Sequence, residues 1–342
     1  MGRYPMTLFD GQFDDERNAI DSALRKNLAA LPEKVRDVAT YHFGWTDQDG
    51  TPVEGRQGKR LRPLLTLLIG RGLGADSEQV LPAAVAVELI HNFSLLHDDV
   101  IDEDEYRRAR RTAWAAFGRP AAILVGDSLH ALAFEVLGGM EVDRLPTATA
   151  LLGNTVNRLI RGQMSDVHFE RRSRVELNEC TVMATDKTAS LLETATLLGA
   201  LSASDDHEVG QRAGAFGYHL GLLFQHVDDL LGIWGDPAKT GKSTYSDLAN
   251  RKKSLPIVAA LESSRAEATL LRDYYYRDTA TDDASLADMA RLVEECGGRD
   301  ASRESARVHH RAACDALEDL PLEETIKAQL HTVATDLINR ES

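Results

Sequence analysis

Apolar residues recur at helical spacing along most of the chain. In residues 61–68 and again in residues 85–96, leucines, valines and a phenylalanine stand three or four positions apart, which places them on one face of an α-helix. Sustained alternation of apolar and polar residues, the pattern of a half-buried strand, is hard to find anywhere. The pattern therefore predicts an all-α fold.

Proline and glycine positions divide this helical pattern into segments. No proline occurs between Pro146 and Pro237, and that stretch is rich in Leu, Ala, Thr and Glu, which favours consecutive long helices. Glycine, proline and small polar residues predict helix breaks at residues 47–58, 72–77, 138–146, 171–174, 203–207 and 235–241.

The domain organisation follows from what interrupts the pattern. No internal repeat, low-complexity tract or linker stands out in the 342 residues. The weakest point is residues 279–285, whose small polar residues resemble a loop between two helices more than a linker between domains. We expect residues 1–342 to form a single domain.

Composition narrows the class of protein. The formal net charge of −15 argues against a nucleic-acid partner, because binding a phosphate backbone needs a concentrated excess of Lys and Arg. No glycine-rich phosphate loop is present, so the common nucleotide-binding folds are also disfavoured. If an acidic protein of this kind binds an anion, a metal ion is expected to mediate the contact.

The same composition points to a cytoplasmic protein. No stretch reaches the roughly 18 uninterrupted apolar residues of a membrane span, and the first residues lack a basic region followed by an apolar one. The three cysteines show no CxxC spacing, and their odd number fits a reducing compartment.

A first cluster of carboxylates ends the apolar pattern of residues 85–96. Asp98 and Asp102 are four apart and share a helix face, with Asp99 one residue round. Such a cluster costs stability unless a cation or an arginine lies nearby. A solvated helix end is the alternative, and an EF-hand calcium loop is disfavoured because its central glycine is missing.

A second cluster makes the metal interpretation stronger. Asp228 and Asp229 end another apolar run, FQHVDDLLGIWGD. Two carboxylate clusters on separate helices can face each other across a cavity. Ligands that are all oxygen suit Mg²⁺, which binds through one or two carboxylates together with substrate phosphates. We therefore expect a diphosphate ligand.

Basic residues near helix ends supply the third signal. They occur in GKRLRP at 58–63, in the arginine pair 107–108, in Lys187 followed by Thr188, and in GKSTYSDLANRKK at 241–253. A diphosphate pocket in an acidic protein needs such cations. Each segment alone is typical of a solvated helix end, and only the ensemble is specific.

The ordered set GKRLRP, ELIHNFSLLHDDVIDEDEYRR, GQMSD, KTASL, FQHVDDLLGIWGD and GKSTYSDLANRKKSLP resembles the trans-prenyl (polyprenyl or geranylgeranyl) diphosphate synthase family. The resemblance covers a motif-bearing core of about residues 55–260, and the C-terminal helices, residues 261–342, carry little signature. It implies a bundle of long helices around a central cavity, a homodimer, and condensation of isopentenyl diphosphate with an allylic diphosphate.

The resemblance also implies a role for each motif residue. Asp98 and Asp102 would bind two Mg²⁺ ions and Asp228 a third, with Asp99 and Asp229 supporting the water shell. Thr188 and Gln225 match positions beside the developing allylic cation. Cations that would neutralise the allylic diphosphate are Arg107, Lys187, Lys242 and Lys252. Residues that match the isopentenyl diphosphate pocket are Lys59, Arg62, His91 and Arg108.

Product length in this family is set by side chains below the first aspartate motif. Ser94 is one helical turn below Asp98, and Phe93 is the nearest aromatic residue that could form a floor. A single aromatic residue at this place resembles geranylgeranyl synthases more than farnesyl ones. We therefore expect a twenty-carbon product, with fifteen carbons as the alternative. The other interpretation of Phe93 is that it is an ordinary core residue and no floor.

Two other functions have weaker support. A class I terpene cyclase has an aspartate-rich site but needs no second diphosphate pocket, which the residues Lys59, Arg62, His91 and Arg108 argue against. A non-catalytic subunit of a heteromeric synthase is expected to lack aspartates of the first motif, and all three are present.

Three positions depart from the family pattern. Gly232 stands where the second motif often has a third aspartate, so we expect a weaker outer shell for the third metal, which Gly232→Asp would strengthen. Ala109 stands where glycine is common, which affects local backbone freedom. His226 occupies a place that is usually apolar.

Overall fold

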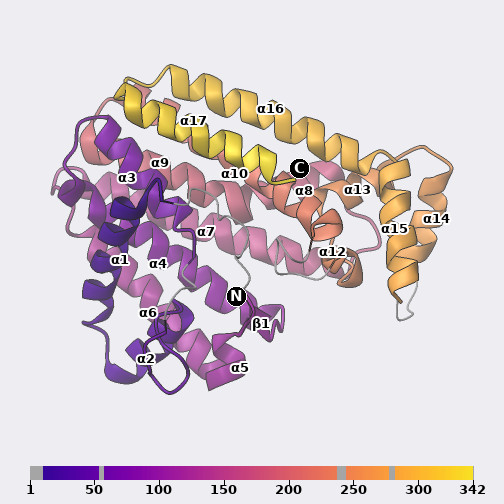
Figure 1. Ribbon diagram of the computed structural model, residues 1–342, viewed down its shortest axis with the longest axis horizontal. Coiled ribbons are helices and arrows are strands. Elements are labelled where there is room, and N and C mark those ends of the chain that lie inside the picture. The colour runs from indigo at the N-terminus through magenta and orange to yellow at the C-terminus, as the bar shows by residue number, and fades with distance from the viewer. Residues whose placement is uncertain (1–10, 54–57, 237–243, 277–281, 342) are drawn as a thin grey trace.

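The computed structural model describes residues 11–53, 58–236, 244–276 and 282–341. Within these ranges the chain is almost wholly helical, and the only strands are β1 (Tyr106–Arg107) and β2 (Arg110–Arg111), which form one antiparallel hairpin. Figure 1 shows long helices stacked side by side, with shorter ones at both ends. The all-α prediction is confirmed.

The N-terminal half supplies the first part of the bundle. Its helices are α1 (Asp14–Leu28), α2 (Glu33–His42), α3 (Leu61–Gly72), α4 (Ser77–Ile101), α5 (Ala113–Phe117), α6 (Arg119–Leu137) and α7 (Leu145–Glu170).

The second half begins with a nearly continuous helix that contains a π-helical turn. The helices are α8 (Leu177–Ala184), the π-helix η1 (Thr185–Ala189), α9 (Ser190–Ala203), α10 (His207–Trp234), α12 (Ser246–Ala249), α13 (Leu255–Glu262), α14 (Glu267–Tyr275), α15 (Asp283–Glu295), α16 (Gly298–Glu318), α17 (Glu324–Ile338) and the 3-10 turn η2 (Asn339–Glu341).

Helix α4 lies at the centre of the main core. It packs on α3, α6 and α9 and is apolar nearly all round, as expected of a helix enclosed by others. Both α4 and α6 are long and apolar enough to cross a membrane, but they pack against each other, and two thirds of the most apolar window of α4 is buried inside the protein. Their composition therefore fits core helices.

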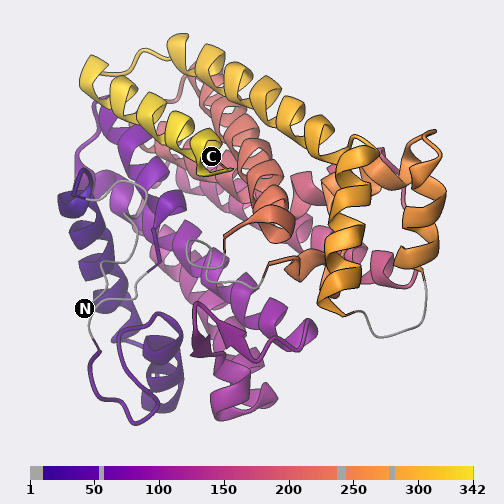
Figure 2. The ribbon, with the colours of Figure 1, turned by 45° about the vertical axis from the view of Figure 1, so that its right-hand side comes forward.

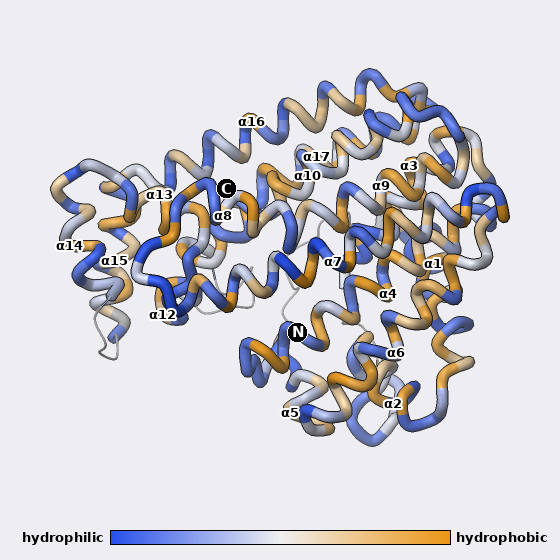
Figure 3. Tube along the Cα trace, turned by 180° about the vertical axis from the view of Figure 1, so that it is seen from behind, coloured by the Kyte–Doolittle hydropathy of each residue, from blue (hydrophilic) through white to orange (hydrophobic). Residues whose placement is uncertain are grey.

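The outer helices are amphipathic. Helix α16 runs along α10 and buries mainly small residues there, and its hydrophilic and hydrophobic residues alternate in Figure 3. A smaller apolar cluster holds α13, α14 and α15 together at one end of the molecule (Figure 2). The single domain stays a prediction.

The predicted breaks agree with the observed helix ends. Five of them coincide with a gap between helices, although residues 54–57 of the first lie outside the described residues and the third runs two residues into α7. The sixth follows the end of α10 at Trp234, and its residues 237–241 also lie outside the described residues. Of the loop predicted at 279–285, only the part from residue 282 is described, and α15 begins at Asp283. The break at Gly118, where φ is 91°, and the π-helix were not predicted.

Candidate active site

A cavity of about 2500 Å³ opens between the C-terminal ends of α4 and α10. Helix α7, the π-helix η1, the start of α3 and the β1–β2 hairpin also line it. Lys242 lies outside the described residues, and Asp99 is buried behind the wall. The predicted residues on the lining are Lys59, Arg62, His91, Phe93, Ser94, Asp98, Asp102, Arg107, Arg108, Lys187, Thr188, Gln225, Asp228, Asp229 and Lys252.

The first aspartate pair stands at the end of α4. Asp102 is the C-cap residue, and its backbone N–H donates to the carbonyl of Asp98 at 2.8 Å, so the two carboxylates keep the one-turn spacing. Lys187 Nζ lies 3.7 Å from Asp98 Oδ1 and 2.6 Å from Asp166 Oδ2. Burial raises the pKa of Asp102. Lys187 thus neutralises part of the negative charge that Asp98, Asp102 and Asp166 bring together.

The α7 motif GQMSD supports this pair from the opposite side. Asp166 binds Lys187, and Gln163 Nε2 lies 3.4 Å from Asp102 Oδ1. We assigned neither residue a role from the sequence, although the motif itself was the signal that could have indicated one.

Asp99 has a different environment from its neighbours. It is buried, and Arg107 Nε donates to its Oδ1 at 2.6 Å. Burial raises the pKa of Asp99 to about 6 in spite of that arginine. This contact ties the β1–β2 hairpin to α4, and the predicted water-shell role of Asp99 stays a prediction.

The second pair lies on α10 and is linked to η1 by hydrogen bonds. Thr188 Oγ1 donates to Gln225 Oε1 at 2.5 Å, and Gln225 Nε2 donates to Asp229 Oδ1 at 2.6 Å. The backbone N–H of Leu255 donates to Asp229 Oδ2 at 2.9 Å. Burial, with the negative charge of Asp247 nearby, raises the pKa of Asp229 to about 8. Both oxygens of Asp229 thus accept bonds from the protein.

Gly232 leaves room for another carboxylate. A Cβ placed on Gly232 would lie 2.5 Å from the carboxyl carbon of Asp247, which comes from α12. The missing third aspartate of the motif is therefore matched by an acidic side chain that reaches the same place from a different element. With Asp247 in this place, we expect Gly232→Asp to have the opposite effect to the one inferred from the sequence.

The opposite wall carries basic groups. Arg62 Nη1 lies 3.3 Å from His91 Nε2, and because a guanidinium only donates, Nε2 must be the unprotonated nitrogen. Burial and the charge of Arg62 hold the pKa of His91 well below 6.5. His91 is therefore neutral, and its Nδ1–H is left to donate.

Lys59 stands at the exposed mouth of the same wall. Partial burial and the charges of Arg340 and Arg108 lower the pKa of Lys59 to about 8. Between Lys59 and Arg62, Arg60 turns away with a left-handed φ of 51°, and it is buried against Asp21 (2.9 Å) and Glu88 (2.8 Å). Arg60, the N-cap residue of α3, thus anchors the chain between Lys59 and Arg62.

Arg108 is presented by a strained turn. In the hairpin Arg107 pairs with Arg110, and the two turn residues, Arg108 and Ala109, have φ of 52° and 59°. Two consecutive positive φ values define a tight hairpin of the I′ kind, which favours glycine. The alanine at 109 is thus held in a conformation that L-residues rarely adopt.

Known proteins resemble this chain over nearly its whole length. The polyprenyl synthetase family matches residues 51–293. The chain belongs to the polyprenyl synthetase family. It is 41% identical to a (2E,6E)-farnesyl diphosphate synthase of Mycobacterium tuberculosis, covering 94% of this chain and 91% of that protein, and 37% identical to a geranylgeranyl diphosphate synthase of the same organism, covering 93% and 91%.

The fold agrees with the sequence comparison. The crystal structure of a polyprenyl synthetase from Streptomyces coelicolor A3(2) superposes with a TM-score of 0.90 at 42% identity, covering 95% of this chain and 98% of that one. The chain is accordingly an enzyme, a prenyl diphosphate synthase, as the sequence predicted.

Below the first aspartate pair, this polyprenyl synthetase places an aromatic group. The Phe93 ring lies 4.8 Å from the His97 ring and 5.1 Å from the His130 ring. Ser94 Oγ donates to the carbonyl of His91 at 2.8 Å. Phe93 lines the cavity, and 92% of its surface is covered. Its position is therefore compatible both with a cavity floor and with an ordinary core residue.

His226, which was unexplained by the sequence, faces polar residues of α16. Its ring stacks 6.0 Å from that of His309, and Nδ1 lies 3.4 Å from Ser302 Oγ. Burial lowers the pKa of His226 to about 4. A neutral histidine in this place is a packing and hydrogen-bonding residue.

The carboxylates suit the magnesium on which members of this family depend. Asp98, Asp102 and Asp228 offer only oxygen ligands on the cavity wall, and Mg²⁺ binds through one or two carboxylates with water and substrate phosphates as its other ligands. Among the described residues no three His, Cys, Asp or Glu side chains gather closely enough to hold an ion. The donor set fits ions shared with a diphosphate.

Proposed function

We propose that the enzyme condenses isopentenyl diphosphate with an allylic diphosphate in this cavity. One observation carries the proposal: a single cavity has carboxylates with lysine on one wall and Arg62, Lys59 and neutral His91 on another. Such a division provides one place for a metal-bound diphosphate and another for a diphosphate bound without metal.

On the carboxylate side, Asp98 and Asp102 would hold two Mg²⁺ ions and Asp228 a third. When bound, magnesium neutralises the departing diphosphate. Lys187, with Arg107 and Lys252, would add positive charge at the same place. These side chains favour heterolysis of the allylic carbon–oxygen bond.

Two groups are arranged to stabilise the allylic cation. Thr188 donates its hydroxyl proton to Gln225, so its oxygen lone pairs remain available to face positive charge. Gln225 is itself oriented by Asp229. Neither oxygen is activated as a nucleophile, which allows stabilisation without trapping the cation.

On the other side, His91 Nδ1–H and the cations Lys59, Arg62 and Arg108 would bind isopentenyl diphosphate. Its alkene attacks the cation, and a proton then leaves the new carbocation. The released diphosphate is a sufficient base for that proton.

For the product we propose twenty carbons, with Phe93 as the floor. Fifteen carbons is the second candidate, because a relative 41% identical to this chain is a farnesyl diphosphate synthase. Chromatography of the dephosphorylated alcohols tests both. We expect Phe93→Ala to lengthen the product by one or more units and Ser94→Phe to shorten it, since one helical turn of about 5.4 Å is close to one isoprene unit. Identical products from both variants would place the floor elsewhere.

We also propose that the enzyme works as a cytoplasmic homodimer and that residues 1–342 form one domain. Sedimentation at several protein concentrations tests the dimer.

The reaction itself is tested with labelled isopentenyl diphosphate in the presence and absence of an allylic primer. We expect label in a longer diphosphate only when both substrates and Mg²⁺ are present. Consumption of the allylic diphosphate alone would favour a cyclase, and no turnover with any primer would favour a non-catalytic subunit.

A further inference from the structure

The π-helix η1 presents two neighbouring residues to two different walls. Lys187 reaches toward Asp98 and Asp166, on α4 and α7, whereas Thr188 bonds to Gln225 on α10. A π-helical turn contains one residue more than an α-helical turn and is stable only where its surroundings hold it. The contacts that hold η1 come mainly from α7 and α10.

Close backbone packing confines η1 on two sides. A Cβ on Gly162 of α7 would lie 2.5 Å from the backbone nitrogen of Lys187, and a Cβ on Gly221 of α10 would lie 2.5 Å from Cα of Ala189. Both distances are shorter than real contacts, so only glycine permits this approach. This packing encloses the π-helix but does not by itself fix its rotation about the helix axis.

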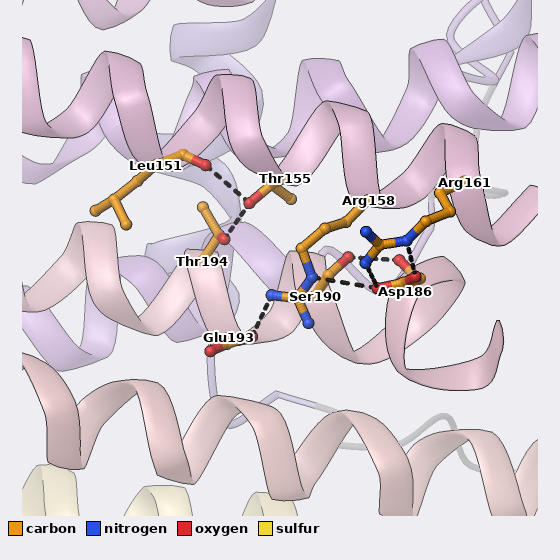
Figure 4. A network of polar contacts seen from close by, with 8 residues as sticks. All are labelled: Leu151, Thr155, Arg158, Arg161, Asp186, Ser190, Glu193 and Thr194. Atoms are coloured by element: carbon orange, nitrogen blue, oxygen red, sulfur yellow. Dashed lines mark hydrogen bonds and ion pairs between the residues drawn. The ribbon is translucent and has the colours of Figure 1, made fainter. Parts of the chain in front are cut away.

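Asp186 supplies the directional contact (Figure 4). Its carboxylate is buried and accepts two hydrogen bonds from Arg161, at 2.6 and 2.8 Å. Arg158 Nε adds a third at 3.3 Å, while its Nη1 donates to Glu193 of α9 at 2.7 Å. Two arginines of α7 thus bind Asp186, the residue immediately before Lys187.

The charge of Asp186 is maintained by these partners. Burial alone would raise its pKa, but the hydrogen bonds from Arg161 and Arg158 lower it below the ordinary value. A buried carboxylate with a forked arginine contact is directional as well as strong. Its removal would leave η1 free to return toward α-helical geometry.

We propose that Asp186 is a positioning residue, which holds η1 so that Lys187 and Thr188 reach their separate walls at the same time. Asp186 lines no part of the cavity itself and touches neither reacting group. The inference rests on the proposed function, because it assigns Lys187 and Thr188 their roles in ionisation.

A double-mutant cycle tests it through single-turnover rates, which stay measurable when slow. We expect Asp186→Asn to lower the rate about tenfold with KM for isopentenyl diphosphate within about twofold. In a Lys187→Ala/Thr188→Ala background the same change should cost less than about threefold, because residues that act through one another are not additive.

Asp205→Asn is the matched control. Asp205 pairs at 3.0 Å with Arg144, the N-cap residue of α7, at the far end of that helix from Arg158 and Arg161, so losing this ion pair should leave the rate unchanged in both backgrounds. If Asp186→Asn does not fold, Arg161→Gln replaces it in the same cycle, since the Arg161 side chain is 65% exposed.

An equal loss in both backgrounds, or a lowered melting temperature with a normal rate, would overturn the inference. Failure of the wild-type enzyme to consume isopentenyl diphosphate would instead overturn the proposed function, and the two outcomes are distinguishable.

Discussion

The two aspartate clusters are held differently. At the first, Asp98 and Asp102 line the cavity and Asp99 is buried behind them, whereas at the second, Asp228 and Asp229 both line the cavity. Asp99 is held by the charged Arg107, whereas Asp229 is held by the neutral groups of Gln225 and Leu255. The pKa is raised to about 6 for Asp99 and about 8 for Asp229. Burial raises both pKa values; the charge of Arg107 offsets part of that rise at Asp99, whereas the negative charge of Asp247 adds to it at Asp229.

The largest expected effect removes a charge from the first pair. Asp98→Asn should lower turnover at least ~100-fold at saturating Mg²⁺, because metal-assisted charge stabilisation contributes several kcal/mol. Glu103→Gln is the control, since Glu103 is exposed and pairs with Arg119. Normal turnover of Asp98→Asn would show that the proposed metal site is wrong.

A substitution at Lys59 tests whether the basic wall binds isopentenyl diphosphate while the aspartate pairs bind only the allylic substrate. Lys59→Ala should raise KM for isopentenyl diphosphate roughly tenfold, because a charge-assisted contact to phosphate is worth about 1.5–3 kcal/mol, and should leave KM for the allylic substrate unchanged. Equal weakening for both substrates would contradict the separation of the walls.

The same lysine predicts a pH dependence. Lys59 is cationic below its pKa of about 8 and loses its charge as the pH rises through that value. For isopentenyl diphosphate, kcat/KM should therefore fall above pH 8, and Lys59→Arg should move that fall to higher pH, as measured in pH–rate profiles.

Gly232→Asp sharpens the comparison at the second pair. The new side chain would collide with Asp247 and add a negative charge beside Asp229, so we expect a severalfold higher Mg²⁺ requirement and a lower melting temperature. Asp247→Ala in the same chain should reverse both changes. A lowered Mg²⁺ requirement in the single variant would restore the expectation drawn from the sequence.

The smallest effect is on stability without metal. Because the folded protein keeps a proton on Asp229 that the unfolded chain loses, this group costs increasing stability as the pH rises from about 4 to 8. Asp229→Asn should therefore raise the melting temperature in chelator more at pH 8 than at pH 5. Asp99→Asn should show no such gain, since it leaves the partly buried Arg107 without this partner.

Residue patterns were sufficient for the helices and for most of the cavity wall. Helical spacing predicted the long helices because their apolar faces do not depend on the partner helix. The family resemblance of the ordered motifs implied that residues as far apart as Lys59 and Lys252 would line one cavity, and both do.

Other features depended on contacts that a linear pattern does not contain. Asp247 of α12 lies beside Gly232 of α10, although the two residues are 15 positions apart in the sequence. The burial of Arg60 depends on Asp21 of α1, which lies outside every recognised motif. The π-helix is set by glycines of α7 and α10, and nothing in residues 185–189 themselves indicates the extra residue.

That extra residue also decides which apolar cluster each half of the helix meets. Before the π-helix, Cys180 and Ala184 pack in the cluster formed with α13, whereas beyond it Leu192 and Leu198 pack in the main core. One residue corresponds to about 100° of rotation and 1.5 Å of rise. A single deletion in residues 185–189 would therefore misdirect one half or the other, so the enzyme should tolerate gaps there far less well than in its loops, which a scan of single-residue deletions would reveal.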